Sequence, residues 1–238
     1  MNQVQFWTEM YGLLDKYDLL RHPFYEAWRE GALTLHDLRE YACEYYHQVS
    51  FFPVYLKELS ARLPDGELRK SVLENLWDEL GMRNDNRRAH NLLWVDFAVG
   101  TGALPNEVFT RRPMREITVL LETFLALART GTAAEALAAF YVYESQMPRV
   151  AKEKAKMLRM RYGLDEAACR YFTLHTTADV AHAMVWREQL QKLLADEAKA
   201  ANPAIAAAER AAKALWRALD GINAKRGLKS SRQKSHLN

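Results

Sequence analysis

Apolar residues recur at every third or fourth position along almost the whole chain, and no other feature of the sequence restricts the fold as strongly. This period places apolar side chains on one face of an α-helix. Runs that alternate apolar and polar residues between turn dipeptides, which are typical of β-strands, do not occur. The ten glycines and seven prolines fall mostly between the periodic segments. The sequence therefore predicts an all-α fold.

Residues that typically begin and end helices divide this pattern into separate helical segments. Thr34 and Thr132 stand where a side-chain oxygen would cap a helix N-terminus, and Gly163 and Gly221 are typical of helix ends. The expected helices span about residues 3–20, 23–31, 35–63, 66–80, 88–100, 114–130, 133–162, 166–197 and 203–224.

The composition predicts one globular domain with an addition at its C-terminal end. A chain of 238 residues, 49% of them hydrophobic, is long enough to bury a sizeable core. The segment AANPAIAAAERAAKALWRALDG is rich in alanine, whereas KRGLKSSRQKSHLN is polar and basic. We therefore expect a helical domain over residues 1–197, an appended helix over 198–225 and a disordered tail over 226–238.

Charge, cysteine content and the N-terminal sequence argue against several classes of protein. The net charge is only +3, and much of the excess lies after Lys225, so no basic face favours nucleic acid. Cys43 and Cys169 form neither a CxxC pair nor a disulfide framework. The N-terminus lacks the features of a signal peptide, and no segment reaches the roughly 18 apolar residues of a membrane-spanning helix. We expect a cytoplasmic protein that binds neither nucleic acid nor membranes.

Residues 171–190 place two histidines and an aspartate on one face of an expected helix. His175, Asp179 and His182 occupy positions i, i+4 and i+7, and Trp186 continues the same face. A buried carboxylate without a partner is costly, and a metal cation would satisfy all three side chains together. The alternative is that hydrogen bonds alone satisfy them, with Asp179 between the two imidazoles. These residues by themselves leave both interpretations open.

A further acid lies on the expected helix over residues 133–162. Glu144 shares its helical face with Phe140, Met147 and Ala151, so its carboxylate is expected to point into the core. Pro148 has no N–H to donate to the carbonyl of residue 144, and we expect the helix to bend there.

Glu79 and His90 lie close to the two ends of the polar segment MRNDNRR. Glu79 adjoins an apolar face formed by Leu68, Val72, Leu76 and Leu80, just before a glycine ends the helix. His90 opens the next expected helix, and its position relative to the apolar residues that follow directs its ring inward. Glu79 could equally be a surface residue at a helix end.

Together, the expected helices direct three carboxylates and three imidazoles into one interior. Oxygen and nitrogen donors of this kind suit two redox-active metals bridged by carboxylate, with positions left for dioxygen. A single hydrolytic metal typically has about three protein ligands and a water. The larger donor set therefore predicts a dinuclear centre with six candidate ligands: Glu79, His90, Glu144, His175, Asp179 and His182.

Four parts of the sequence resemble the superfamily of haem-oxygenase-like di-metal oxidases and oxygenases. They are the segment HPFYEAWREGALTLHDLREYACEYYHQVSFFPVYL, the acid of NLWDEL, Glu144 and the stretch HTTADVAH, and the resemblance covers about residues 5–195. Within the superfamily the chain is similar to the group of the Chlamydia protein associating with death domains, whose members make p-aminobenzoate for folate synthesis. The resemblance implies a haem-oxygenase-like helical bundle.

The resemblance also implies a ligand set and a cofactor. It places metal ligands at the same six positions and implies two iron ions, or one iron and one manganese, that use dioxygen and an external reductant. The stretch between Glu79 and His90 is longer than the family spacing. Were Asp85 to take the place of His90, the metal preference would change.

In the p-aminobenzoate group, the resemblance implies that the aromatic ring comes from the protein itself. A tyrosine of the chain is cut out as the ring, and a lysine gives the amino group. The matching residues are Tyr25, which follows His22, Pro23 and Phe24, and Lys154; Tyr143 matches a further tyrosine beside the site. Each chain would then turn over about once.

Two other functions stay open at this point. A di-metal oxygenase of the same fold that acts on an external amine or fatty acid would have a deep apolar pocket and many turnovers. A non-enzymatic helical interaction protein is the second alternative, although a buried polar cluster is a poor docking surface. A homodimer is a further expectation for a helical bundle of this kind.

Overall fold

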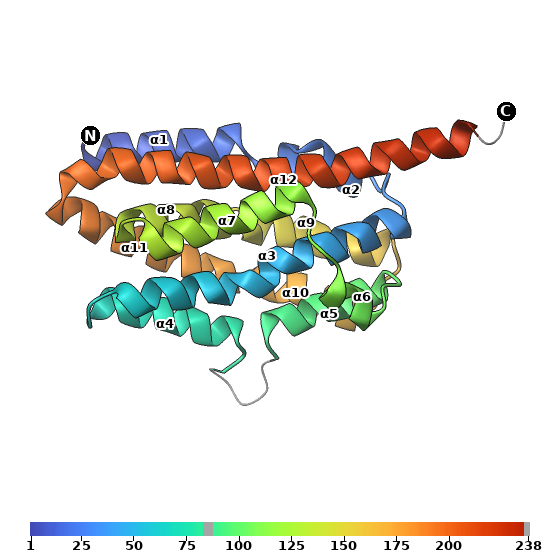
Figure 1. The fold of residues 1–238 in the computed structure, drawn as a ribbon, viewed down its shortest axis with the longest axis horizontal. Coiled ribbons are helices and arrows are strands. Elements are labelled where there is room, and N and C mark those ends of the chain that lie inside the picture. The colour runs from blue at the N-terminus through green and yellow to red at the C-terminus, as the bar shows by residue number, and fades with distance from the viewer. Residues whose placement is uncertain (83–87, 236–238) are drawn as a thin grey trace.

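A computed structural model describes residues 1–82 and 88–235 of the chain, with the side chains of the last helix described as far as Arg226. Throughout these residues the regular structure is helical, as expected (Figure 1). The helices are α1 (Gln3–Lys16), η1 (Leu19–Arg21), α2 (Pro23–Arg29), α3 (Leu35–Arg62), α4 (Glu67–Glu79), α5 (His90–Gly100), α6 (Pro105–Thr110), α7 (Arg115–Thr130), α8 (Ala133–Glu144), α9 (Met147–Met160), α10 (Glu166–His175), α11 (Ala178–Asp196), η2 (Ala198–Ala200) and α12 (Ala201–Ser235).

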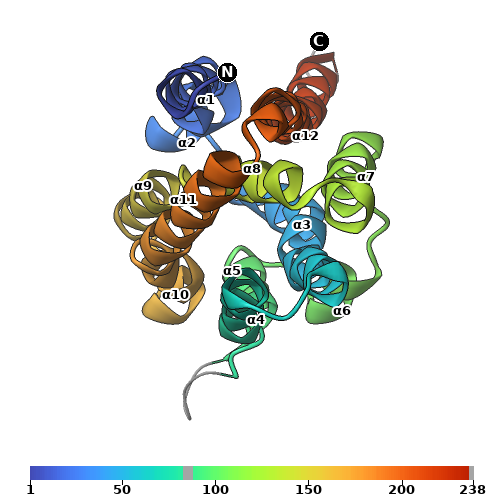
Figure 2. The same ribbon diagram turned by 90° about the vertical axis from the view of Figure 1, so that its left-hand side faces the viewer.

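Two inner helices, α3 and α8, organise the bundle (Figure 2). Helix α3 packs against α4, α5 and α7, and α8 packs against α11 and α12. Helix α10 lies against α5 and α9, whereas α1 and α12 run side by side along one edge (Figure 1). Phe124, Phe140 and Trp186, from three of these helices, are fully buried in one continuous core. The enclosed space next to α4, α5, α8, α10 and α11 receives the polar side chains of the site.

The two predicted N-caps are confirmed, and both belong to the inner helices. The Thr34 hydroxyl accepts from the N–H of Asp37, whose carboxylate accepts from the N–H of Thr34 in return. Thr132 and Glu135 make the same reciprocal pair at the start of α8. Each pair satisfies two backbone donors that the first helical turn would otherwise leave without a partner.

Two long helices expected from the sequence are each divided into two. The segment 133–162 is α8 and α9, separated at residues 145–146, and Pro148 lies in the first turn of α9, where its missing N–H costs nothing. The predicted bend beside Glu144 is therefore a helix break. The segment 166–197 is α10 and α11, separated at Thr176 and Thr177. His175 consequently ends one helix, whereas Asp179 and His182 begin the next.

The C-terminal helix also differs from expectation. Gly221 does not end it: α12 continues to Ser235, and residues 236–238 lie outside the described part of the chain. A Cβ at Gly221 would lie 2.7 Å from Met114 Cε, so the glycine lets α12 approach the start of α7 closely. The helix is not an appendage, because its alanines are buried in the same core as the rest of the bundle.

Three smaller differences concern other helices. The sequence reading missed α6, and it extended α1 through residues that form the short helix η1. Leu80 was expected on a buried face but is 43% exposed, because α4 turns the adjacent Glu79 inward instead. Among the described residues, none of the helices has the length and apolar character needed to cross a membrane.

Candidate metal centre

Five helices bring the six predicted ligand residues into one interior. Glu79 ends α4, His90 begins α5, Glu144 ends α8, His175 ends α10, and α11 carries Asp179 and His182. All six are between 1% and 8% exposed. Most stand at helix ends, where the backbone turns and lets a polar side chain enter a core that is otherwise apolar.

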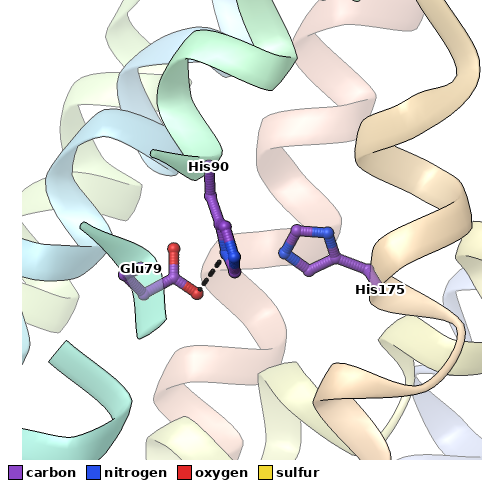
Figure 3. Close-up of side chains that lie close together, drawn as sticks. All are labelled: Glu79, His90 and His175. Atoms are coloured by element: carbon purple, nitrogen blue, oxygen red, sulfur yellow. Dashed lines mark ion pairs between the residues drawn. The ribbon is translucent and has the colours of Figure 1, made fainter. Parts of the chain in front are cut away.

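The first group of donors is formed by Glu79, His90 and His175 (Figure 3). One donor atom from each lies within 4.8 Å of the other two. Glu79 Oε1 is 3.0 Å from His90 Nδ1, and the His175 ring meets that of His90 edge-on at 4.6 Å between centroids. His175 Nδ1 lies 2.7 Å from the backbone carbonyl of Tyr171, which leaves Nε2 as the donor atom toward the group.

The second group is formed by Glu79, Glu144 and His182, which again lie within 4.8 Å through one donor atom each. His182 Nδ1 is 3.3 Å from Glu144 Oε1 and 3.6 Å from Asp179 Oδ1. Asp179 thus lies beside this group, although it belongs to neither set of close donors. Glu79 is common to both groups, so its carboxylate would contribute to the binding of metal at either one.

Neighbouring side chains hold Glu144 and His182 in place. Asn75 Nδ2 donates to Glu144 Oε1 at 3.2 Å, and the Trp186 indole N–H donates to Oε2. On its other side, His182 Nε2 lies 3.4 Å from Asp78 Oδ2. Such outer contacts orient the donor atoms of metal ligands.

The protonation of the centre follows from burial and close pairing. Burial raises the pKa of Glu144, because the charged form loses its hydration. Burial opposes the charged form of His182 as well, but contacts with Asp179, Asp78 and Glu144 raise its pKa to about 12. Protons on imidazoles therefore balance part of the carboxylate charge in the protein alone, and metal ions would displace them.

Several donor atoms in the centre lack a hydrogen-bond partner. Asp179 Oδ2, His90 Nδ1 and His182 Nδ1 are buried and make no hydrogen bond of good geometry with the described residues, although the two nitrogens lie 3.0 and 3.3 Å from the carboxylate oxygens of Glu79 and Glu144. Unpaired buried polar atoms are rare in folded proteins because each costs free energy. Divalent metal ions would satisfy these atoms, so the donor set fits a dinuclear centre. The alternative ligand Asp85 lies outside the described residues.

A second polar cluster lies among aromatic rings. Lys154 Nζ is 2.7 Å from Tyr25 Oη and 2.6 Å from Tyr41 Oη, and the two hydroxyls are 3.1 Å apart. Lys154 is 5% exposed, and its nitrogen lies 4.1 Å from the Tyr25 ring centroid. Burial lowers the pKa of Lys154 well below its ordinary value. Burial therefore favours the uncharged amine over the ammonium form.

Tyr143, Tyr171 and His175 form the wall between the metal-ligand cluster and the Lys154 cluster. All three line two small cavities of about 10 Å³ each, one beside Glu79, Glu144 and Asp179 and the other beside Lys154. The Tyr171 ring stacks on His175 at 4.0 Å between centroids. The predicted residue Tyr143 thus lies between the two clusters.

Sequence reasoning missed Tyr41, Tyr171, Asn75 and Asp78. Tyr41 lies one helical turn before Tyr45 on the buried face of α3, and two tyrosines on a core face were a usable signal. Tyr171 lies one helical turn before His175 on α10, whereas Asn75 and Asp78 contact Glu144 and His182, which are distant in sequence. Their roles became visible only when the helices were placed.

A sequence profile for a family described as iron-containing redox enzymes matches residues 39–216, a range that includes all six candidate ligands. The chain belongs to this family. Membership makes it an enzyme of the oxidase or oxygenase class and disfavours the alternative of a non-enzymatic interaction protein.

Curated relatives of the chain have a more specific name. It is 37% identical over 195 residues to the 4-aminobenzoate synthase of Chlamydia pneumoniae, covering 80% of this chain and 84% of that protein. It is 32% identical over 220 residues to the 4-aminobenzoate synthase of Chlamydia trachomatis serovar D, covering 92% of each. A Shewanella denitrificans domain of unknown function with a haem-oxygenase-like fold superposes with a TM-score of 0.78 at 17% identity, covering 97% of this chain and 96% of that one. The expected haem-oxygenase-like fold is confirmed.

Proposed function

We propose that this chain makes p-aminobenzoate, also called 4-aminobenzoate, for folate biosynthesis in an oxygen-dependent reaction that consumes a tyrosine of its own. Tyr25 supplies the ring and Lys154 the amino group. The observation that carries the proposal is the distance of 2.7 Å between Lys154 Nζ and Tyr25 Oη in a buried, aromatic enclosure. The names of the curated relatives support the same product.

The geometry matches the substitution pattern of the product. In p-aminobenzoate the nitrogen stands para to the carboxyl carbon, and in tyrosine the phenolic oxygen stands para to Cβ. Lys154 Nζ lies beside this oxygen, at the end of the ring that must receive nitrogen. Burial lowers the pKa of Lys154 and so favours the amine, which is the nucleophilic form, over the ammonium. The carboxyl carbon would be Cβ of Tyr25, freed when the Cα–Cβ bond breaks and oxidised by dioxygen. The nitrogen would replace the phenolic oxygen, which leaves as water, and the Cε–Nζ bond of Lys154 would break.

The six candidate ligands would hold two iron ions, or one iron and one manganese. When bound, these metals would supply oxidising chemistry with dioxygen and an external reductant. Glu79, shared by both donor groups, would help to hold both ions, and Asn75 and Trp186 would keep the Glu144 carboxylate oriented. Tyr143 and Tyr171 line both the cavity beside this centre and the cavity beside Lys154, where a tyrosine can pass an electron and a proton.

The size of the interior cavities favours an internal ring over an external aromatic substrate. The cavities beside the metal-ligand cluster and beside Lys154 each measure about 10 Å³, which is about the space one water molecule needs. An oxygenase for a fatty acid would need a deep apolar pocket. Neither cavity provides one.

The test uses full-length protein loaded without oxygen with Fe²⁺, with and without Mn²⁺. Dioxygen and a reductant are then added without any aromatic compound, and mass spectrometry follows p-aminobenzoate and the mass of the chain. We expect about one product molecule or fewer per chain and a mass loss located at Tyr25. Tyr25→Phe should abolish the product while it retains the metals.

Tyr41→Phe is the matched control, because Tyr41 Oη lies equally close to Lys154. Loss of product in this variant alone would assign the ring to Tyr41 and contradict the choice of Tyr25. Many turnovers from an intact chain, with an added amine or fatty acid consumed, would refute the self-consuming reaction and favour the external-substrate oxygenase.

A further inference from the structure

The residue that precedes helix α2 is a fully buried histidine whose two ring nitrogens both have partners. His22 Nδ1 accepts a hydrogen bond from the backbone N–H of Phe24 at 3.1 Å, and Nε2 lies 3.1 Å from Asp220 Oδ1 on α12. Burial lowers the pKa of His22, which favours the neutral ring with a single proton. Because a backbone N–H can only donate, Nδ1 carries no proton. The proton is therefore on Nε2, which donates to Asp220.

Through Nδ1, His22 fixes the start of the helix that carries Tyr25. Helix α2 has only seven residues, and a helix this short depends on contacts at its ends because its first turn is costly to form. Pro23 has no N–H, so the N–H of Phe24 is the first backbone donor of the helix, and the imidazole satisfies it. The His22 carbonyl accepts from the N–H of Tyr25 at 2.8 Å. The placement of Tyr25 therefore depends on His22.

Helix α12 holds the imidazole from the other side. The ring of Trp216 meets that of His22 edge-on at 4.8 Å between centroids, and Asp220 follows one helical turn later on the same face of α12. Without the Asp220 carboxylate, His22 Nε2 would keep a buried N–H that has no acceptor. The tautomer with its proton on Nδ1 would then become more favourable, and that form cannot accept from the N–H of Phe24.

We propose that His22 and Asp220 are positioning residues for the reaction at Tyr25. Asp220 keeps the imidazole in the Nε2–H tautomer, Nδ1 caps α2, and α2 places the Tyr25 hydroxyl against Lys154. This inference rests on the proposed function. It gives α12 a part in the reaction, although none of its described residues lines the cavities beside the metal-ligand cluster and Lys154.

Nuclear magnetic resonance of the metal-free, full-length protein tests the tautomer without any measurement of activity. Spectra of ¹⁵N-labelled histidine should show the Nε2–H form of His22 in the wild type and a gain of the Nδ1–H form in Asp220→Ala. Hydrogen exchange at the Phe24 amide should become about fivefold faster in this variant, the factor that corresponds to the loss of a helix cap of about 1 kcal/mol. The side chain of Asp220 is 57% exposed, so its removal leaves the core packing intact.

Glu209→Ala is the matched control, because Glu209 is the only other acidic residue of α12 and its carboxylate pairs with two lysines away from His22. It should change neither the His22 spectrum nor the exchange of the Phe24 amide. A proton on Nδ1 in the wild type, or the same changes in both variants, would overturn the proposal.

A second experiment links the cap to the reaction. In His22→Asn, the amide oxygen takes the place of Nδ1 as a helix cap, but the side chain is too short to reach Asp220. The metal-loaded variant should keep the yield of p-aminobenzoate and the mass loss at Tyr25, whereas His22→Ala should lose both. Asp220→Ala should lower the yield in the wild-type chain and leave it unchanged in the His22→Asn chain, because the asparagine cap has no tautomer to control.

The outcomes separate this proposal from the proposed function. An equal loss of yield from Asp220→Ala in the two backgrounds would mean that Asp220 acts without His22, and it would overturn the positioning role. An unchanged yield in Asp220→Ala, with product formed by the wild type, would overturn it too. A wild-type chain that forms no p-aminobenzoate would refute the proposed function itself, and the spectra of the metal-free protein would still decide whether Asp220 sets the tautomer that caps α2.

Discussion

Lys154 is a cationic residue type placed where a cation is poorly tolerated. Its nitrogen is surrounded by the rings of Tyr25, Trp28 and Tyr41 and receives no carboxylate contact among the described ion pairs. Its hydrogen bonds go to two phenols, which are themselves uncharged because burial raises their pKa. The proposed role of the amine as nitrogen donor would account for a lysine in a space that methionine or leucine could fill.

Replacing Lys154 with methionine should stabilise the fold, and the gain should depend on pH. Between the lowered pKa of Lys154 and its unfolded value near 10.5, the unfolded chain carries a proton that the folded chain lacks. Wild-type stability therefore rises with pH in this window. The variant's free energy of unfolding should exceed that of the wild type most at the low-pH end of this window. The difference should shrink by about 1.4 kcal/mol per pH unit toward pH 10. Chemical denaturation from pH 7 to 9.5 measures it.

Lys152→Met is the control for this prediction, since Lys152 is exposed on the same helix. It should leave the stability and its pH dependence unchanged. If Lys154→Met were less stable than the wild type at every pH, the two phenols would be holding a charged ammonium, and a nucleophilic amine at this position would be ruled out.

At the scale of helices, the breaks at residues 145–146 and 176–177 determine where the candidate ligands Glu144 and His175 lie. Continuous helices would extend the backbone past Glu144 and His175 without a turn. Because of the breaks, Glu144 is the last residue of α8 and His175 is the last residue of α10; α9 and α11 begin a few residues later. The reciprocal hydrogen bonds of Thr132 and Glu135 cap the N-terminus of α8. Their contribution to stability can be tested without changing the site.

Thr132→Ala should destabilise the protein by about 1 kcal/mol, because it removes the side-chain cap on the N–H of Glu135. The metal content should not change, since Glu144 is held at the opposite end of α8 by Asn75 and Trp186. Thermal unfolding and metal analysis measure the two effects. Thr130→Ala, at an exposed hydroxyl that bonds only within α7, is the control and should have little effect on stability. A loss of metal in Thr132→Ala would show that the start of α8 controls the site.

At the scale of the whole molecule, α12 completes the core. It packs along α8, α7 and α1 through small side chains, and Ala204, Ala208, Ala211 and Ala218 are fully buried. Small residues let helices approach closely, so the alanine-rich composition reflects packing. The expected boundary at residue 198 therefore does not separate an independent unit from the bundle.

Ala211→Asp should destabilise the protein by several kcal/mol, because it forces an unpaired carboxylate into the interface between α12 and the bundle. Ala206→Asp places the same residue on the exposed side of α12 and should change the free energy of unfolding by less than about 0.5 kcal/mol. Denaturant titrations of the two variants compare them directly. Similar small effects would mean that α12 is an appendage after all.

The sequence by itself determined the helical class, the two caps and the identities of the six candidate ligands. The helical class and the caps follow from spacing within single helices, where the 3.6-residue turn relates neighbours directly, whereas the expected single helix through His175, Asp179 and His182 is two helices in the structure. Only the tertiary structure decided that Lys154 contacts both Tyr25 and Tyr41, that Asp78 lies behind His182, and that α12 belongs to the core. These contacts join positions 129, 113 and 104 residues apart in the first three cases. No local pattern encodes such pairs, because they depend on how all the helices pack together.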